Sequence, residues 1–397
     1  MKKIGFVCPW FGWNIPGGAE AELRGLVTHL AESGLTCEVL TTCVREFHAD
    51  WGKAAYRPGT VTERGIVIRR FVPDTRDREA FRNAFTKILA GELPLTDQEE
   101  AAYLAGSVNS KALYDYMDTH RQEYALYVFL PYLFGTTANG VAVAPEKSVV
   151  IPCLHEENYI RLRYFGERFS KVRGMAFLAD AERAVAESAF DLSKVEKAVL
   201  GAGVDTEFTA DGARFREKYG IGEHFLLYAG RKSRGKNVYT LLYCFERYLA
   251  EHPDSDLKLV LIGGGEIILP DSLDGRVLEL GFVDAQDKYD AYAAADLLVQ
   301  PSRMESFSIV IMESWLCGRP VLVHGDCAVT KEFAVRSGGG LYFEDYFEFA
   351  AAVEYLTTHP AESAAMGESG RAFVLEHFSW DAIVRKYTEF FQRLAGE

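Results

Sequence analysis

A cluster of cations directly after a predicted strand is the strongest chemical signal in the sequence. The segment from Leu226 to Asn237 reads LLYAGRKSRGKN, with four cations in six positions, at 231, 232, 234 and 236. Arginine supplies a fork of donors and lysine a mobile point charge, which suits a diphosphate leaving group whose charge grows as its bond breaks. A solvated basic turn would have the same composition, because charged loops are common on protein surfaces.

Two glutamates eight positions apart form a second signal. Glu305 and Glu313 lie in a segment that follows another predicted strand and opens a helix. If this segment were all helix, the pair would lie roughly 12 Å apart at about 1.5 Å per residue. Each carboxylate could then hold one set of hydroxyls at either end of a diphosphate, while free amides at the helix start would favour phosphate. Those amides belong to Ser306, Phe307 and Ser308.

Both glutamates also have ordinary explanations. Glu305 could be an acidic residue near a helix start, and Glu313 could be an exposed helix position. The neighbours of Glu313, however, are apolar and predict a largely buried helix, in which an unpaired carboxylate would be costly. They are Ile311, Met312, Trp315 and Leu316.

Glycine-rich turns after predicted strands allow the backbone to approach a ligand closely. Gly17 and Gly18 follow the first strand and lead into an amphipathic helix, and a second turn reads Gly263-Gly264-Gly265-Glu266. Neither turn is a GxGxxG fingerprint, so nicotinamide or flavin binding has little support. Either turn could also serve only to reverse the chain.

His155 follows a strand predicted to end near Cys153, which would point it at the cleft expected between two facing doubly wound domains. A lone histidine is more often a structural residue, held by hydrogen bonds. The adjoining segment 158–174 carries five cations interleaved with aromatic residues. It could bind an anionic acceptor or a membrane surface, or form a solvated amphipathic face.

Composition limits the functions that these residues can serve. The chain has 397 residues with 43 Lys+Arg against 57 Asp+Glu, a net charge of −14, so no overall field attracts nucleic acid or an anionic bilayer. Seven scattered cysteines without a CxxC pair disfavour structural zinc and predict reduced thiols in a cytoplasm. We expect no secretion signal and no spanning helix, because the apolar runs are too short.

Short β-branched runs, glycine turns and helical stretches alternate along the chain and predict a parallel α/β architecture repeated in two halves. Strands are predicted at 4–8, 36–42, 66–71, 127–130 and 149–153, then at 225–229, 257–262, 277–281, 297–300 and 320–323. Helices are predicted near 19–33, 99–118 and 174–188, then near 239–251, 287–295, 309–317 and 330–337. The glycine-rich segment after residue 200 indicates a boundary near 210, and 74–100 is the segment with the least clear pattern.

Together these motifs resemble the retaining, nucleotide-sugar-dependent glycosyltransferases of family four (glycosyl transferases group 1), which have the GT-B fold. The resemblance is strongest from Phe225 to Phe343, in LLYAGRKSRGKN, LVLIGGGE, LELGFV, the two-glutamate segment and GGGLYF, and weaker at PGGAE, GVD and FSWDAIVRKY. It implies two Rossmann-like doubly wound domains facing across a cleft. Residues 1–209 with the helix at about 379–397 would form the acceptor side, and residues 210–378 the donor side.

The resemblance also implies roles for individual residues. Arg231 and Lys236 would bind and stabilise the departing diphosphate, Glu305 would hold the donor sugar and Glu313 the ribose. The backbone of Ser306, Phe307 and Ser308 would lie beside the donor, although the family most often has glycine where Ser308 stands. The remaining roles would belong to Gly17 and Gly18 near the phosphates, Gly264, Phe282 and Val283 near the nucleobase, and His155 near the transferred sugar.

The resemblance predicts transfer with retention, by front-face attack, of a sugar from a UDP or GDP sugar to a glycan, lipid-linked or small-molecule acceptor. This fits polysaccharide biosynthesis. It predicts no metal and no other cofactor, because cations and helix termini would neutralise the phosphates. We expect a cytoplasmic protein without nucleic acid partners, with peripheral membrane contact through 158–174 as an option. The alternatives are a GT-B epimerase or phosphorylase, or a catalytically silent nucleotide-sugar-binding subunit.

Overall fold

The computed structural model describes residues 2–222 and 224–396, and the chain folds as two compact units. Unit 1 comprises Met1–Gly203 together with Trp380–Glu397, and unit 2 comprises Val204–Ser379. The observed division falls a few residues before the boundary near 210 that the glycine-rich linker suggests.

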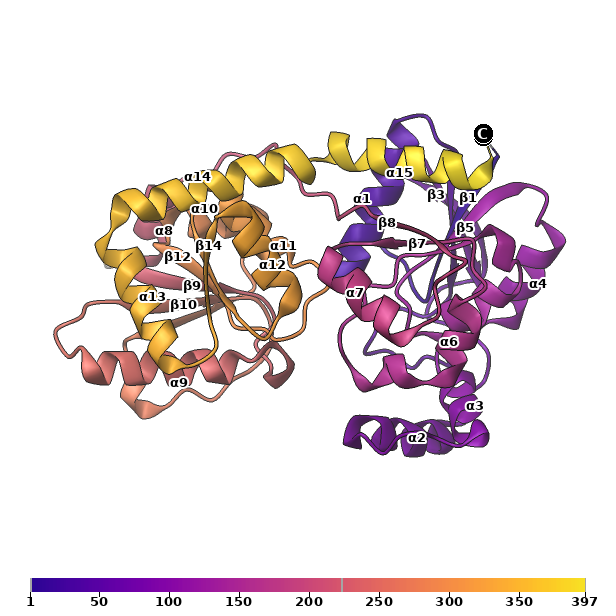
Figure 1. Ribbon diagram of the computed structural model, residues 1–397, viewed down its shortest axis with the longest axis horizontal. Helices are drawn as coiled ribbons and strands as arrows, with labels where there is room; N and C mark the ends of the chain where they lie inside the picture. The colour runs from indigo at the N-terminus through magenta and orange to yellow at the C-terminus, as the bar shows by residue number, and fades with distance from the viewer. Residues whose placement is uncertain (1, 223, 397) are drawn as a thin grey trace. The chain divides into compact units, whose positions relative to one another are not determined.

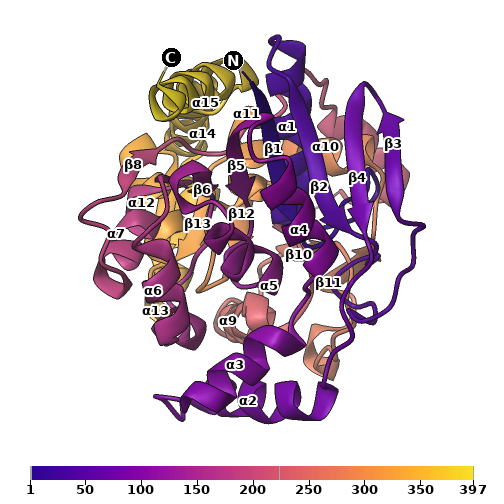
Figure 2. The same ribbon diagram turned by 90° about the vertical axis from the view of Figure 1, so that its right-hand side faces the viewer.

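The sheet of unit 1 has eight strands in the order β3-β4-β2-β1-β5-β6-β7-β8. All neighbours pair in parallel except β3, which forms an antiparallel edge with β4, as Figure 2 shows. Without β3 and β8 the order is that of a Rossmann fold, whose direction of winding reverses between β1 and β5. The strands are β1 Lys3–Cys8, β2 Cys37–Thr42, β3 Gly59–Glu63, β4 Ile66–Phe71, β5 Tyr124–Phe129, β6 Ser148–Val150, β7 Gly174–Phe177 and β8 Glu196–Val199.

Helices connect these strands and carry apolar faces onto the sheet. They are α1 Gly18–Glu32, α2 Arg78–Ala90, α3 Asp97–Gly106, α4 Lys111–Thr119, α5 Gly135–Ala138, α6 Arg163–Phe169, α7 Asp180–Ala189 and α15 Trp380–Ala395, with short 3₁₀ turns at Gly140–Ala142, Pro145–Lys147 and Asn158–Arg161. Figure 1 shows α2 standing away from the sheet, with α3 between it and the rest of unit 1.

The final helix, α15, belongs to unit 1 because Trp380 fits a space that only glycines leave. A Cβ atom at Gly25 or at Gly203 would lie 2.2 Å from the Trp380 ring. The His29 ring stacks on the same indole with centroids 4.3 Å apart, and Phe391 meets Phe6 of β1 edge to face. Because Gly25 and Gly203 have no side chains, the C-terminal helix can pack against α1.

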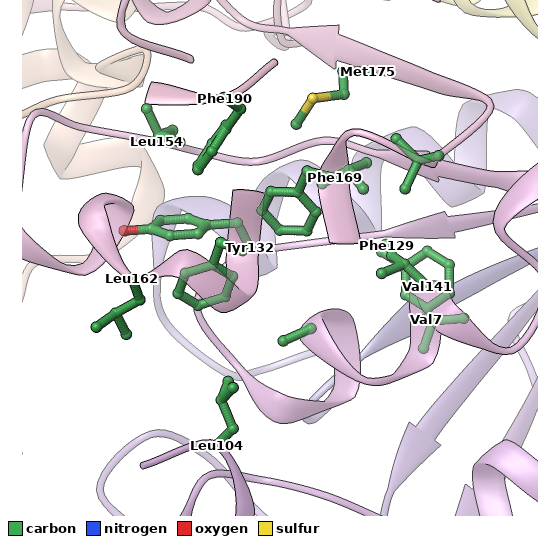
Figure 3. Packing of buried hydrophobic residues seen from close by; sticks show 14 of the residues in the cluster. Val7, Leu104, Phe129, Tyr132, Val141, Leu154, Leu162, Phe169, Met175 and Phe190 are labelled. Carbon is green, nitrogen blue, oxygen red and sulfur yellow. The ribbon is translucent and has the colours of Figure 1, made fainter. Parts of the chain in front are cut away.

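The main core of unit 1 lies between the sheet and helices α2 to α7. Tyr132, Phe165 and Phe169 are fully buried there, and Figure 3 shows Phe129, Phe169, Met175 and Phe190 among the packed side chains. Most of this cluster comes from the second half of the sheet, so the strand ends near His155 rest on a closely packed base.

Unit 2 has a six-stranded, fully parallel sheet in the order β11-β10-β9-β12-β13-β14, again a Rossmann order. Its strands are β9 Phe225–Ala229, β10 Lys258–Ile262, β11 Val277–Gly281, β12 Leu297–Gln300, β13 Val321–His324 and β14 Gly340–Phe343. Its helices are α8 Gly212–Tyr219, α9 Val238–Glu251, α10 Ala285–Ala294, α11 Ile309–Leu316, α12 Ala328–Ser337, α13 Tyr346–Thr358 and α14 Pro360–His377, with 3₁₀ turns η4 Arg234–Lys236 and η5 Asp271–Leu273 (Figure 1).

Two predicted helices are wrong in part. Residues 174–177 form the buried strand β7, and the helix begins only at Asp180, because a short run of buried residues has no period that separates a strand from a helix. The predicted helix 99–118 is two helices, broken where Asn109 donates to the carbonyls of Leu104 and Ser107. The segment 74–100 contains α2 and the start of α3.

Candidate active site

Lys236 and Glu305 are brought together at the carboxyl edge of the unit 2 sheet, where its winding reverses between β9 and β12. Lys236 ends the turn η4 after β9, and its Nζ lies 2.7 Å from Oε1 of Glu305, which follows β12. The lysine side chain is one-third exposed, while that of Glu305 is 11% exposed. Open α/β sheets bind ligands at this position, and the pair offers a cation and a carboxylate side by side.

Asn237 links these two loops, and it is not among the residues predicted from the sequence. Its backbone is left-handed, with φ of 57°, a conformation that asparagine tolerates better than most residues. Its Nδ2 donates to the carbonyl of Pro301 at 2.9 Å, and Thr240 donates to its Oδ1 at 2.6 Å. Asn237 therefore fixes the β9 loop to the β12 loop next to Lys236 and Glu305.

Arg231 and Lys232 differ sharply in exposure. Arg231 is exposed, and its carbonyl accepts a hydrogen bond from Tyr228 at 2.8 Å. Lys232 is 3% exposed, donates to the carbonyl of Gly263 at 2.9 Å and pairs with Glu279 at 2.8 Å. Of these two cations in the basic segment, Arg231 is thus available to a ligand, and Lys232 ties the β9 loop to the β10 loop and to strand β11.

The glycine turn after β10 is required by close packing. A Cβ at Gly263 would lie 2.2 Å from the carbonyl oxygen of Gly230, and one at Gly265 would lie 2.4 Å from that of Lys232. Gly264 lies against the ring of Phe282, which is 80% exposed, and Val283 follows it. The structure thus brings together the Gly264 and Phe282 loops that the family resemblance links to a nucleobase.

Glu313 is buried, as its neighbours predict, but it is not unpaired. It lies on α11 with 6% exposure, forms an ion pair with Lys288 and accepts a hydrogen bond from Tyr292 at 3.0 Å. Both partners are on α10 and were not identified from the sequence, because nothing in the spacing of 288, 292 and 313 links them. One carboxylate oxygen of Glu313 therefore pairs with the lysine, and the other accepts the hydrogen bond from the tyrosine.

The segment between the two glutamates is not helical throughout. Helix α11 begins at Ile309, and Ser308 is its N-cap, so Ser306 and Phe307 lie in the preceding turn. The helical spacing of roughly 12 Å from about 1.5 Å per residue does not apply to this segment. The N-cap side chain of Ser308 makes no hydrogen bond to the first amides of α11, and such amides can bind an anion.

Ser308 has φ of 77° and ψ of 77°, a left-handed conformation that glycine adopts far more easily. The family resemblance places glycine at this position, and the backbone supplies the physical reason. The Ser308 hydroxyl accepts a weak hydrogen bond from Gln300 at 3.3 Å. The serine is therefore accommodated at a cost in backbone strain.

In unit 1, Gly17 has φ of 139° and is the N-cap of α1, while Gly18 has open space around its Cα. A Cβ at Gly17 would lie 1.9 Å from Oε2 of Glu20, whose other oxygen accepts from Trp10 at 2.7 Å. Gly17 thus makes room for a carboxylate of its own helix.

His155 lies after β6, partly exposed, with its Nδ1 3.5 Å from Oε1 of Glu157. The backbone before it is held by Glu182, which is 1% exposed and accepts from the amides of Leu154 at 2.7 Å and Leu178 at 2.6 Å. Burial raises the pKa of Glu182 to about 7, and the two amides oppose that rise. Glu182 therefore joins the ends of β6 and β7, a role with no sequence signal.

Three of the five cations of segment 158–174, and two of its rings, have partners within unit 1, while Arg161 and Lys171 are exposed. Arg163 pairs with Asp97 and Glu100 of α3, Arg168 donates to the Tyr164 hydroxyl, and Arg173 donates to the carbonyl of Leu394. Phe165 and Phe169 are fully buried in the core. Membrane contact by this segment stays a prediction.

Within residues 2–222 and 224–396, no three His, Cys, Asp or Glu side chains are grouped as metal ligands would be. In the same part of the chain, no helix has the length and apolar character needed to cross a bilayer.

Comparisons with known proteins agree with the geometry of unit 2. Residues 223–359 match the family model described as Glycosyl transferases group 1. This segment is a group 1 glycosyltransferase domain. It contains the Lys236–Glu305 pair, Glu313, and the two loops that carry Gly264 and Phe282. Similarity continues beyond the domain: the chain is 28% identical to D-inositol 3-phosphate glycosyltransferase 1 of Catenulispora acidiphila, over 94% of this chain and 90% of that protein.

With a D-inositol 3-phosphate glycosyltransferase of Rhodococcus jostii, also 28% identical, the alignment covers 51% of this chain and about half, 48%, of the relative. Two solved structures share the fold. Sucrose-phosphate synthase from Thermosynechococcus elongatus has a TM-score of 0.73 at 16% identity, covering 100% of both chains. Anabaena Alr3699/HepE, in complex with UDP and glucose, has a TM-score of 0.68 at 16% identity, covering 99% of this chain and 100% of that one. The predicted GT-B fold, with its two Rossmann-like domains, is confirmed.

Proposed function

We propose that the chain is a retaining glycosyltransferase that moves a sugar from a nucleoside diphosphate sugar to an acceptor hydroxyl. The observation that carries the proposal is the Lys236–Glu305 pair beside the uncapped start of α11, within a group 1 domain. A cation, a carboxylate and backbone amides thus lie together at one edge of the unit 2 sheet.

In this proposal Lys236 exchanges its carboxylate partner for the donor diphosphate, and Arg231, exposed on the same loop, joins it. Their charges stabilise the diphosphate as the glycosidic bond breaks, and the first amides of α11 contribute further donors. Glu305, released from Lys236, accepts hydrogen bonds from the donor sugar's hydroxyls. These groups neutralise the phosphates without a metal.

Glu313 is proposed to hold the ribose hydroxyls, with Lys288 and Tyr292 fixing its orientation. The exposed ring of Phe282 above Gly264, with Val283, is proposed to receive the base of a UDP or GDP sugar. No side chain is placed as an enzymic nucleophile, so the departing phosphate accepts the acceptor's proton as the new bond forms on the same face. Gly17, Gly18 and His155 keep the roles that the family resemblance predicts.

The acceptor is proposed to be a small polyol, a glycan or a lipid-linked sugar. Similar proteins support this range, because their names include transferases to D-inositol 3-phosphate and an alpha-monoglucosyldiacylglycerol synthase. Cytoplasmic location and a place in polysaccharide synthesis remain part of the proposal.

Thermal unfolding with a panel of UDP and GDP sugars tests the donor assignment. A donor that binds the folded chain raises the unfolding temperature by mass action. We expect a shift with at least one donor, and the loss of that shift in Lys236→Ala. No shift with any member of the panel would contradict the proposal. Release of nucleoside diphosphate only when an acceptor is present would separate transfer from epimerase activity or silent binding.

A further inference from the structure

Four aromatic side chains gather at the carboxyl edge of unit 1, outside the site described above. We call them the aromatic shelf: Trp10, Phe47, Trp51 and Phe134. Trp10 and Phe134 are 3% exposed and meet edge to face with centroids 4.8 Å apart. Trp51 lies 5.6 Å from Phe134 and 5.8 Å from Phe47, whose ring is 49% exposed.

The shelf is built from three loops that follow parallel strands. Trp10 comes after β1, Phe47 and Trp51 after β2, and Phe134 after β5. The Trp51 indole donates to the carbonyl of Phe47 at 2.8 Å, which fixes the β2 loop internally. The exposed ring of Phe47 thus stands on a rigid aromatic base at the edge where α/β sheets bind ligands.

Arg76 contacts the aromatic shelf at Trp51. Its guanidinium carbon is 4.9 Å from the Trp51 ring centroid and 4.7 Å from that of Phe81 on α2. A Cβ at Gly52 would lie 3.1 Å from Cγ of Arg76, so the glycine after Trp51 leaves space for the arginine stem. Two rings and a glycine therefore hold the guanidinium in one place.

This positioned cation forms no ion pair with any carboxylate of residues 2–222 and 224–396, and the Nε of Arg76 is buried without a hydrogen-bond acceptor. Burial, with the charge of Arg78 nearby, lowers the pKa of Arg76, and Asp50 offsets this only in part. A half-buried arginine with unused donors creates a local demand for an anion.

The acids around Arg76 are committed elsewhere. Asp50 pairs with Arg78 and accepts from the Gly52 amide. Asp74 accepts from the amide of Lys111 at 3.0 Å, and Asp77 caps α2 through the amides of residues 79 and 80. Arg76 thus lies against Trp51, whose ring contacts the exposed Phe47, in a protein whose net charge is −14.

We propose that the aromatic shelf and Arg76 form an acceptor-binding site for a sugar or polyol that carries an oxyanion, a phosphate or a carboxylate. The Phe47 ring packs against the apolar face of the acceptor, and the Arg76 fork binds the oxyanion in a bidentate manner. This rests on the proposed function, which it deepens by naming the acceptor's chemistry. It assigns anion binding to Arg76 rather than to Arg163, Arg168 and Arg173 of segment 158–174, which already have protein partners.

Calorimetric titration of the full chain tests the site with glucose 6-phosphate, glucuronate and glucose at constant ionic strength. We expect at least one of the two anionic sugars to bind wild type at least tenfold more tightly than glucose. The phosphate and the carboxylate probes identify which oxyanion is preferred. Equal binding of all three sugars, or no saturable binding of either anionic sugar, would overturn the proposal.

Arg76→Gln keeps a long stem against Trp51 and Phe81 but removes the charge, so it should abolish the preference for the anionic sugar. Arg82→Gln, an exposed position on α2, is the matched control and should keep it. Phe47→Ala should weaken the anionic sugar and glucose by the same factor. A preference that survives in Arg76→Gln would overturn the assignment, and the unfolding temperature of each variant reports whether it is folded.

The same variants separate this proposal from the donor assignment. Thermal stabilisation by UDP and GDP should be unchanged in Arg76→Gln and lost in Lys236→Ala. The preference for the anionic sugar should be lost in Arg76→Gln and unchanged in Lys236→Ala. Nucleotide binding without the anionic-sugar preference would sink only the acceptor site. Anionic-sugar binding without any nucleotide effect would sink only the donor assignment.

Discussion

The carboxyl edges of the two sheets have the same topology but different chemistry. In unit 2 the loops meet through charged and polar contacts: Lys236 with Glu305, Lys232 with Glu279, and Asn237 with Pro301. In unit 1 they meet through aromatic rings packed mostly edge to face, and Arg76 lies against Trp51 of one loop and Phe81 of α2. In the proposed function, one Rossmann sheet edge binds a charged diphosphate and the other an amphipathic acceptor, so that loop composition rather than topology would set the ligand.

The unit 2 edge depends on few charges, so the largest effect is expected there. Lys236→Ala should lower turnover by about two to three orders of magnitude, because the diphosphate loses its most directly placed cation as charge develops. Steady-state release of nucleoside diphosphate measures the change. Arg234→Ala removes an exposed cation from the same turn and should leave turnover nearly unchanged. Equal losses in both variants would mean that general charge, not position, matters.

The unit 1 edge instead contains a buried carboxyl group that destabilises the folded state by an amount that depends on pH. Glu22 on α1 is 3% exposed, and neither oxygen has a hydrogen-bond partner of normal geometry. Burial raises the pKa of Glu22 from 4.5 to about 8, and the Gly203 amide offsets only part of the rise. Because folding favours the protonated form, this residue makes the fold less stable as pH rises from 4.5 to 8.

Glu22→Gln should remove that dependence. Its free energy of unfolding relative to wild type should increase by about 2 kcal/mol between pH 6 and pH 8, because the slope of about 1.4 kcal/mol per pH unit falls off as the pH approaches the folded-state pKa of about 8. Urea unfolding at the two pH values measures the change. Glu32→Gln, at the exposed end of the same helix, serves as the control and should show no such trend. A constant difference across this range would show that Glu22 ionises normally.

Glu182 tests whether the unit 1 edge also needs polar positioning. Glu182→Gln replaces one acceptor by an amide donor, so either the Leu154 or the Leu178 amide loses its partner, at about 1–3 kcal/mol. We expect kcat to fall roughly tenfold through displacement of His155, with little change in donor KM. Glu187→Gln, on the exposed side of α7, should retain full kcat. An unchanged kcat in a folded Glu182→Gln would remove the positioning role.

The smallest effect concerns backbone strain in unit 2. Ser308→Gly should raise the free energy of unfolding by about 0.5–1 kcal/mol, because glycine adopts the observed left-handed conformation freely. The 3.3 Å contact with Gln300 that is lost is too long to cancel the gain. Chemical denaturation measures the difference, with Ser306→Gly as the matched variant at a position without positive φ. Greater destabilisation at 308 than at 306 would contradict the strain argument.

Local patterns in the sequence were enough to predict several parts of the molecule. The alternation of strands and helices predicts a parallel α/β architecture in two halves, and the apolar neighbours of Glu313 predict its burial. The spacing of Arg231, Lys236 and Glu305 after strands predicts that they share one edge. These inferences succeed because parallel strands place every following loop on the same side of the sheet.

Other features depend on residues far apart in the chain. Lys288 and Tyr292 contact Glu313 from another helix. Glu182 accepts a hydrogen bond from the backbone just before His155. Arg76 packs against Trp51, which belongs to a different loop. The sequence alone determined which chemical groups this protein carries and the edge of the sheet that each one follows. The tertiary structure decided which charges are paired and which stay open, because burial and partner distance depend on packing between segments that no local spacing records.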